Sequence, residues 1–206
     1  MLDILTSKST DYLILNEVIA EDDRDVYEYG FHALYNNIID ISSIAIISVW
    51  LNQVPQTILY HISFIILRNI AGGFHAKTHL RCFIMSTVIW LLSLLAISMM
   101  ALPLNCLGLA GVAVVLIWVK APVEHDNSPL SAEKHRRMKL YSRVASAVFF
   151  TIILFTYLLM KEYIWIAVSL AYGMASHAFL ILGSLLQARL SKTRGQAVNL
   201  HRPMLY

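Results

Sequence analysis

The chain has 206 residues, of which 58% are hydrophobic and only 14% are charged, and its mean hydropathy is +0.63. A soluble domain is about half apolar and about one quarter charged. The composition therefore excludes disordered, collagen-like and small disulfide-stapled proteins. The net charge of +3 and the pI of about 8.9 have an explanation in membrane topology, and we expect no nucleic-acid partner.

Six apolar stretches predict six transmembrane segments. Each is close to the length of about 17–25 residues that a helix needs to cross a hydrocarbon core of about 30 Å. Such segments must be helical, because an unpaired backbone amide in lipid costs several kcal/mol. We therefore predict an all-α polytopic membrane protein with about six transmembrane helices, at Phe31–Leu51, Val54–Ile70, Leu80–Leu102, Leu104–Val119, Val144–Met160 and Tyr163–Ala188.

The basic residues predict the orientation of these helices. Fifteen of the sixteen Lys and Arg residues lie on one side of the predicted bundle, and only Lys161 lies on the other. Because Lys and Arg are enriched in cytoplasmic loops, both termini are expected in the cytoplasm. We expect one integral-membrane domain over 1–206, with an amphipathic N-terminal segment (1–30), a six-span bundle (31–188) and a basic tail (189–206). The first segment has eight acidic residues and lacks the pattern of a secretory signal.

Two cysteines occur in different surroundings. Cys82 lies at the predicted cytoplasmic start of the third span, beside Arg81, whereas Cys106 lies among leucines near the opposite face. The two are expected to be too far apart for a disulfide. Positive neighbours and a helix N-terminus both favour a thiolate, so Cys82 is the candidate nucleophile and Cys106 is expected to be a buried apolar residue.

A cysteine nucleophile needs a base, and two histidines precede Cys82. His79 lies three residues before it and would be its neighbour on a continuous helix, whereas His75 lies seven residues before it. Spacing favours His79 unless the chain bends after Gly72-Gly73, where paired glycines favour a turn. A different interpretation is a zinc site formed by His75, His79 and Cys82, as in a metal-binding transporter.

Three motifs resemble the accessory gene regulator B (AgrB) family. The first is Arg68-x-x-x-Gly72-Gly73-x-His75-Ala76 with Cys82 seven residues after the histidine. The second is Ala121-Pro122-Val123-Glu124-x-x-Asn127-x-Pro129-Leu130 in the predicted fourth connection. The third is Tyr27-x-Tyr29-Gly30 just before the first span, and the length and the layout of six spans are similar too.

The resemblance implies a membrane-embedded cysteine endopeptidase of a Gram-positive bacterium, active on the cytoplasmic side. Members of that family trim an AgrD-like propeptide and help to make the cyclic thiolactone or lactone autoinducing peptide of quorum sensing. By position, His75 is then the base and Cys82 the nucleophile, which implies the bend that spacing alone does not require.

Further residues complete the expected site. Arg68, Gly72 and Gly73 are candidates for an oxyanion or substrate-binding loop, and Glu124 and Asn127 are candidate supporting residues. The expected partners are the propeptide and the lipid bilayer, with no cofactor, and a homodimer is left open. A non-enzymatic peptide exporter is the third interpretation beside the peptidase and the metal transporter.

Overall fold

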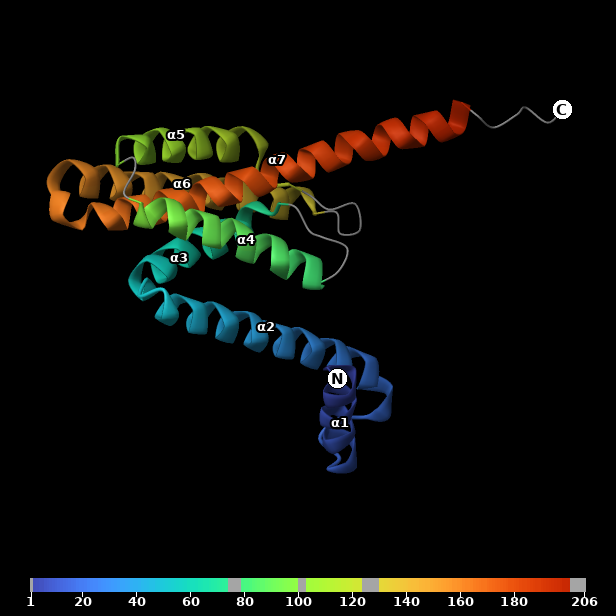
Figure 1. The fold of residues 1–206 in the computed structure, drawn as a ribbon. Coiled ribbons are helices and arrows are strands. Elements are labelled where there is room, and N and C mark those ends of the chain that lie inside the picture. The colour runs from blue at the N-terminus through green and yellow to red at the C-terminus, as the bar shows by residue number, and fades with distance from the viewer. Residues whose placement is uncertain (1, 74–78, 100–102, 124–129, 201–206) are drawn as a thin grey trace. The chain divides into compact units, whose positions relative to one another are not determined.

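The computed structural model describes residues 2–73, 79–99, 103–123 and 130–200. These residues form helices and no strand, so the prediction of an all-α protein is confirmed. The chain divides into two compact units, Met1–Val54 and Pro55–Tyr206, each of which is described by itself. The helices shown in Figure 1 are α1 (Leu2–Leu15), α2 (Arg24–Trp50), α3 (Val54–Ala71), α4 (His79–Ser98), α5 (Pro103–Lys120), α6 (Ala132–Leu159) and α7 (Ile164–Leu200).

Four stretches of helix are long and apolar enough to cross a membrane: Glu21–Trp50, Leu80–Ser98, Ala132–Leu159 and Lys161–Arg189. They overlap the first, third and fifth predicted spans over most of their length and contain the sixth. The fourth predicted span corresponds to a shorter apolar helix, Cys106–Lys120. The second predicted span is the helix α3, but α3 is not among the four, and its apolar run is broken by His61, Arg68 and Asn69. The chain is a multi-pass membrane protein with an all-helical bundle.

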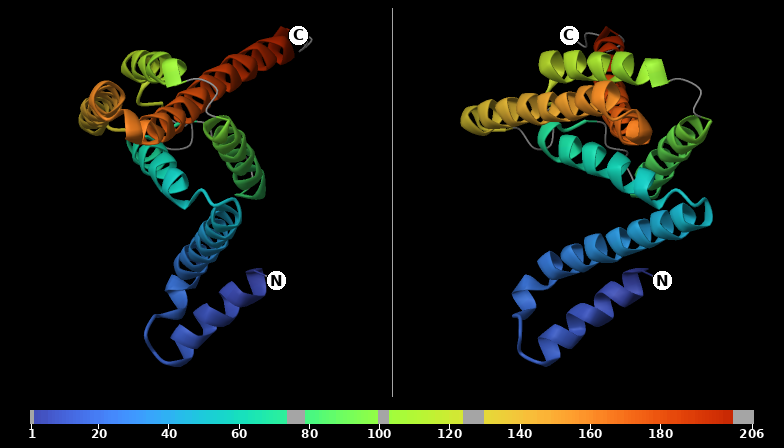
Figure 2. Two further views of the ribbon diagram at one scale, coloured as in Figure 1. Left: turned by 60° about the vertical axis from the view of Figure 1, so that its left-hand side comes forward. Right: turned by 90° about the vertical axis from the view of Figure 1, so that its left-hand side faces the viewer.

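The N-terminal unit is a pair of packed helices (Figure 2). Hydroxyl groups face the contact between α1 and α2: Thr6 and Thr10 are buried, and Ser9 Oγ lies 2.5 Å from the Tyr35 hydroxyl. Several apolar side chains of α1 are exposed, namely Ile4, Leu5, Tyr12 and Leu15. An exposed apolar face on a helix that precedes a membrane span is what an interfacial helix requires.

The second unit has its core between α5, α6 and α7. Alanines occupy many of the contact positions, and small residues let membrane helices approach closely. The core includes Ala110, Ala113, Ile117, Ile153, Ala171, Met174 and Ile181. Polar contacts also join α5 to α6, because Trp118 Nε1 donates to Ser146 Oγ at 3.1 Å and Arg143 donates to the Trp118 carbonyl at 3.0 Å.

Helix α3 crosses α7 at Gly173. A Cβ atom at this position would collide with the Tyr60 carbonyl oxygen and the Ser63 hydroxyl, so only glycine permits this approach. Ser63 Oγ donates to the Leu170 carbonyl at 3.1 Å across the same contact. The close crossing holds α7 against the face of α3 that also carries Phe64 and Leu67, both buried.

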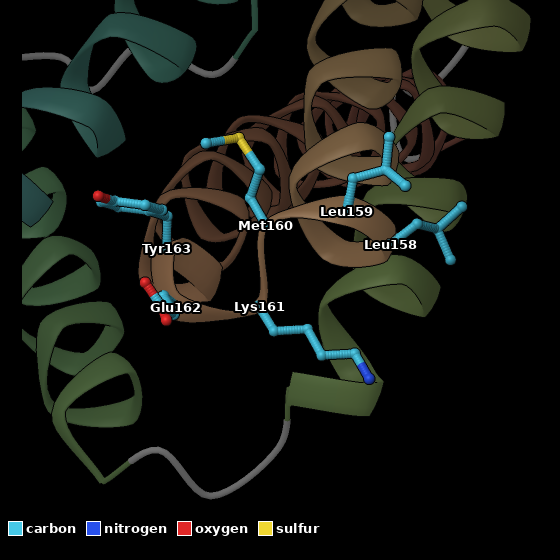
Figure 3. A pocket seen from close by; sticks show the side chains of 6 residues that line it. All are labelled: Leu158, Leu159, Met160, Lys161, Glu162 and Tyr163. Atoms are coloured by element: carbon cyan, nitrogen blue, oxygen red, sulfur yellow. The ribbon is translucent and has the colours of Figure 1, made fainter.

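Two helices extend beyond the predicted spans. Helix α6 begins twelve residues earlier than Val144, with the Ser131 side chain accepting from the Lys134 backbone N–H at 3.3 Å. Helix α7 runs to Leu200, so most of the predicted basic tail is helical. Helices α6 and α7 are joined by a short turn, and a shallow pocket lies at this turn (Figure 3). The residues that line the pocket are Leu158, Leu159, Met160, Lys161, Glu162 and Tyr163. This turn contains the predicted Lys161-Glu162 connection.

Candidate active site

The candidate site is built on the turn that ends α3. The helix stops at Ala71, and the Gly72 N–H still donates to the Arg68 carbonyl at 3.2 Å. Gly72 and Gly73 then take φ values of +71° and +135°. These values lie in the left-handed region, where a side chain is strained and glycine is not. The paired glycines therefore end the helix and turn the chain, as their pattern predicts.

A second predicted motif is attached to this turn. The Val123 N–H donates to the Ala71 carbonyl at 2.9 Å, and Gly72 and Val123 form an isolated parallel β-bridge. A Cβ atom on Gly72 would collide with the Val123 carbonyl oxygen. The segment after α5 is thus held by backbone contacts to the turn after α3, although the two are about fifty residues apart in the chain.

Arg68 and Cys82 come together at the same place. Arg68 lies in the last turn of α3, and its Nη1 atom lies 3.3 Å from where a Gly73 Cβ would be. Its guanidinium is within Coulombic range of the Cys82 thiol. Cys82 is half-buried in the first turn of α4, which begins at His79. The structure thereby joins a predicted loop residue to the predicted nucleophile.

Some of the predicted site residues lie outside the described part of the chain. His75, Glu124 and Asn127 lie outside the residues that the structure describes. His79 is the first residue of α4 and lies three positions before Cys82 on the same helix. His75 as the base, and Glu124 and Asn127 as supporting residues, stay predictions.

His177 lies next to the turn but is not among the predicted site residues. Its side chain is fully buried on α7, with Cε1 3.9 Å from where a Gly73 Cβ would be. Its ring stands edge-on to Phe64, with the ring centres 6.5 Å apart, and it is within Coulombic range of Arg68. The sequence feature that could have identified His177 is its position within an otherwise uncharged apolar span, because an ionisable residue there is a functional candidate by default.

The two thiols are free, as predicted, and differ in surroundings. Cys106 is buried in the core of α5, α6 and α7, whereas Cys82 is half-buried beside Arg68. In the described ranges, no three His, Cys, Asp or Glu side chains gather as a metal site would require. The zinc interpretation therefore has no geometric support there, although His75 lies outside those ranges.

Comparison with known proteins agrees with the motifs. The chain is 25% identical over 138 residues to an AgrB-like protein of Listeria monocytogenes, covering 65% of this chain and 67% of that protein. It is 26% identical over 131 residues to accessory gene regulator protein B of Staphylococcus saprophyticus, covering 61% and 67%. No solved structure matches. The family model for accessory gene regulator B matches residues 6–182, and the chain therefore belongs to that family.

Proposed function

We propose that this protein is a membrane-embedded cysteine endopeptidase that cleaves an AgrD-like propeptide and promotes its cyclisation. The observation that carries the proposal is the Arg68 guanidinium beside the glycine turn and within Coulombic range of the Cys82 thiol. Membership of the accessory gene regulator B family supports the substrate class. The product is then an autoinducing peptide of a quorum-sensing system.

The choice of Cys82 as nucleophile rests on its surroundings. A cation and a helix N-terminus both stabilise a thiolate, which is the reactive form of cysteine. Arg68 supplies the cation, and the first turn of α4 supplies the helix N-terminus. Cys106 has neither and is buried in an apolar core, so it is a packing residue in this proposal.

The first step is acyl transfer to sulfur. His75 takes the Cys82 proton, and the thiolate attacks the carbonyl carbon of the scissile peptide bond. The C–N bond breaks, His75 returns the proton to the leaving amine, and a thioester joins the N-terminal part of the propeptide to Cys82. The Gly72 N–H already donates to the Arg68 carbonyl, and the bridge to Val123 engages the neighbouring backbone, so these two amides are not proposed as oxyanion donors.

The second step closes the ring. His75 takes the proton of an internal thiol or hydroxyl of the peptide, whose sulfur or oxygen attacks the thioester carbonyl. The Cys82 S–C bond breaks, and Cys82 leaves as the thiolate beside the protonated His75. Exchange of one thioester for another is nearly neutral in free energy, so closure competes with hydrolysis and requires that water be excluded. A site at the boundary of the membrane favours that exclusion.

The segment after α5 is proposed to complete the site. Val123 is hydrogen-bonded to Ala71, and Glu124 follows it directly in the chain. A residue that follows a fixed position is about 3.8 Å from it between Cα atoms. Glu124 and Asn127, which follow Val123 in the chain, are proposed to orient His75 or the substrate.

Reconstitution with a cognate propeptide tests the proposal. In proteoliposomes, Cys82→Ala and Cys82→Ser should abolish cleavage, while Cys106→Ala is the matched control and should cleave normally. His75→Ala should lose cleavage by about 10²–10⁴-fold, as expected for a general base, while His79→Ala should keep most activity. Cleavage by Cys82→Ala would reject the proposal, and loss of cleavage on adding a chelator would support the metal interpretation instead.

A further inference from the structure

We infer that His177 is a positioning residue that holds Arg68 against Cys82. The inference rests on the proposed function, because it assigns His177 a part in preparing the nucleophile. His177 comes from α7, more than one hundred residues beyond Arg68 in the chain, and it reaches the turn only because α7 crosses α3 closely.

The imidazole presents its polar edge to the turn. Cε1 is the ring atom that lies between Nδ1 and Nε2, and it is the His177 atom nearest to where a Gly73 Cβ would be, at 3.9 Å. Arg68 Nη1 lies 3.3 Å from the same point. Arg68 Nη1 and the nitrogen-bearing edge of the His177 imidazole therefore both lie close to Gly73, and the absence of a side chain there leaves room for both.

Burying the His177 imidazole costs free energy unless its nitrogens interact with another group. The side chain is 0% exposed, and among the described residues neither ring nitrogen has a hydrogen-bond partner. A buried polar group without a partner is unfavourable, and a phenylalanine would fill the same space without this cost. A neutral imidazole does have one property that phenylalanine lacks, which is an acceptor nitrogen.

An acceptor beside a buried guanidinium stabilises it. The Arg68 cation has lost water by burial, and the neutral His177 imidazole lies within Coulombic range of it without a direct hydrogen bond, so the ring dipole replaces part of that lost hydration. The Phe64 ring stands edge-on to the imidazole, with the ring centres 6.5 Å apart, and limits its orientation. Loss of the acceptor should therefore let Arg68 withdraw from Cys82.

The test reads the state of Cys82 without any substrate. In purified protein in liposomes, the rate of Cys82 alkylation by iodoacetamide is measured against pH in a Cys106→Ala background. Arg68→Gln should move the midpoint of this profile upward by about one pH unit or more, because a neighbouring cation is lost. Arg81, which also neighbours Cys82 in the chain, is unchanged in every variant.

His177 variants then separate polarity from packing. His177→Phe should move the midpoint upward by about 0.5 pH unit or more, and His177→Gln, which keeps an acceptor, should restore at least half of that shift. His177→Leu serves as a second apolar variant if His177→Phe does not fold. The control is His61→Phe, another histidine of the bundle, whose Nδ1 already lies 2.9 Å from the Thr57 carbonyl oxygen of its own helix, and it should leave the midpoint unchanged.

An unchanged midpoint in folded His177→Phe or His177→Leu would overturn the inference, and so would equal shifts in the phenylalanine and glutamine variants. Failure of wild-type protein to cleave the propeptide would instead reject the proposed function, because alkylation is measured without propeptide. An unchanged midpoint in Arg68→Gln would also contradict the inference, since Arg68 would then have no effect for His177 to support.

Discussion

Replacing Gly173 with alanine should destabilise the bundle by wedging α3 and α7 apart. The added methyl group would collide with the Tyr60 carbonyl oxygen, which is backbone and cannot move unless α3 moves. Overpacking of this kind costs about 1–3 kcal/mol. Separation of the helices would also break the hydrogen bond from Ser63 to the Leu170 carbonyl, which contributes about 0.5–1.5 kcal/mol. Alanine returns about 0.5–1 kcal/mol in helix preference, so a net loss of about 0.5–4 kcal/mol is expected.

Gly108 on α5 is the matched control, because a Cβ atom there would have nothing within 4 Å. Gly108→Ala should therefore leave stability unchanged or raise it by up to about 1 kcal/mol. The measurement is reversible unfolding in mixed micelles with an increasing fraction of sodium dodecyl sulfate, followed by tryptophan fluorescence. Equal unfolding midpoints for Gly173→Ala and Gly108→Ala would refute the close crossing of α3 and α7.

Three further predictions follow from the turn, the core and the charge distribution. Gly72→Ala should cleave about tenfold more slowly or worse. An alanine would have to adopt the left-handed backbone conformation of Gly72, which costs about 1–2 kcal/mol, and its methyl group would collide with Val123. Wild-type cleavage by Gly72→Ala would contradict the docking of Val123. Cys106→Ala should unfold about 1 kcal/mol more easily while its cleavage rate is kept, and a lost rate in folded protein would make Cys106 part of the site. Reporters fused after Lys139 or at the C-terminus should report the cytoplasm, and one at Lys161 the outside; an external C-terminus would overturn the orientation.

Much of the fold follows from hydropathy, because a helix is the structure that satisfies the backbone in lipid. The predicted span Val144–Met160 lies inside α6 except for its last residue, and Tyr163–Ala188 lies inside α7 except for its first residue. The polar extensions of both helices escape prediction, since hydropathy says nothing about charged residues that continue a helix into water. Lys134 and Arg137 are examples, the first donating to the Ser131 cap and the second paired with Glu133 at 2.6 Å.

The site was predictable where the chain itself carries the information. The glycine pair predicts a turn because of its backbone freedom, and Cys82 is marked by its basic neighbours. Contacts between distant segments leave no such local signal. The attachment of Val123 to the turn is a pair of backbone interactions that any residue types can make, and the position of His177 depends on a helix crossing made possible by Gly173.

The central claim is that Cys82 forms an acyl-enzyme, and trapping that intermediate tests it most directly. A propeptide whose internal cysteine or serine is replaced by alanine can acylate the enzyme but cannot close the ring, so the thioester should accumulate. Mass spectrometry of the digested protein should find the peptide adduct on Cys82, removable by hydroxylamine, in wild-type protein and in Cys106→Ala. No adduct should form in Cys82→Ala. An adduct on Cys106, or cleavage by Cys82→Ala at the wild-type rate, would contradict the account.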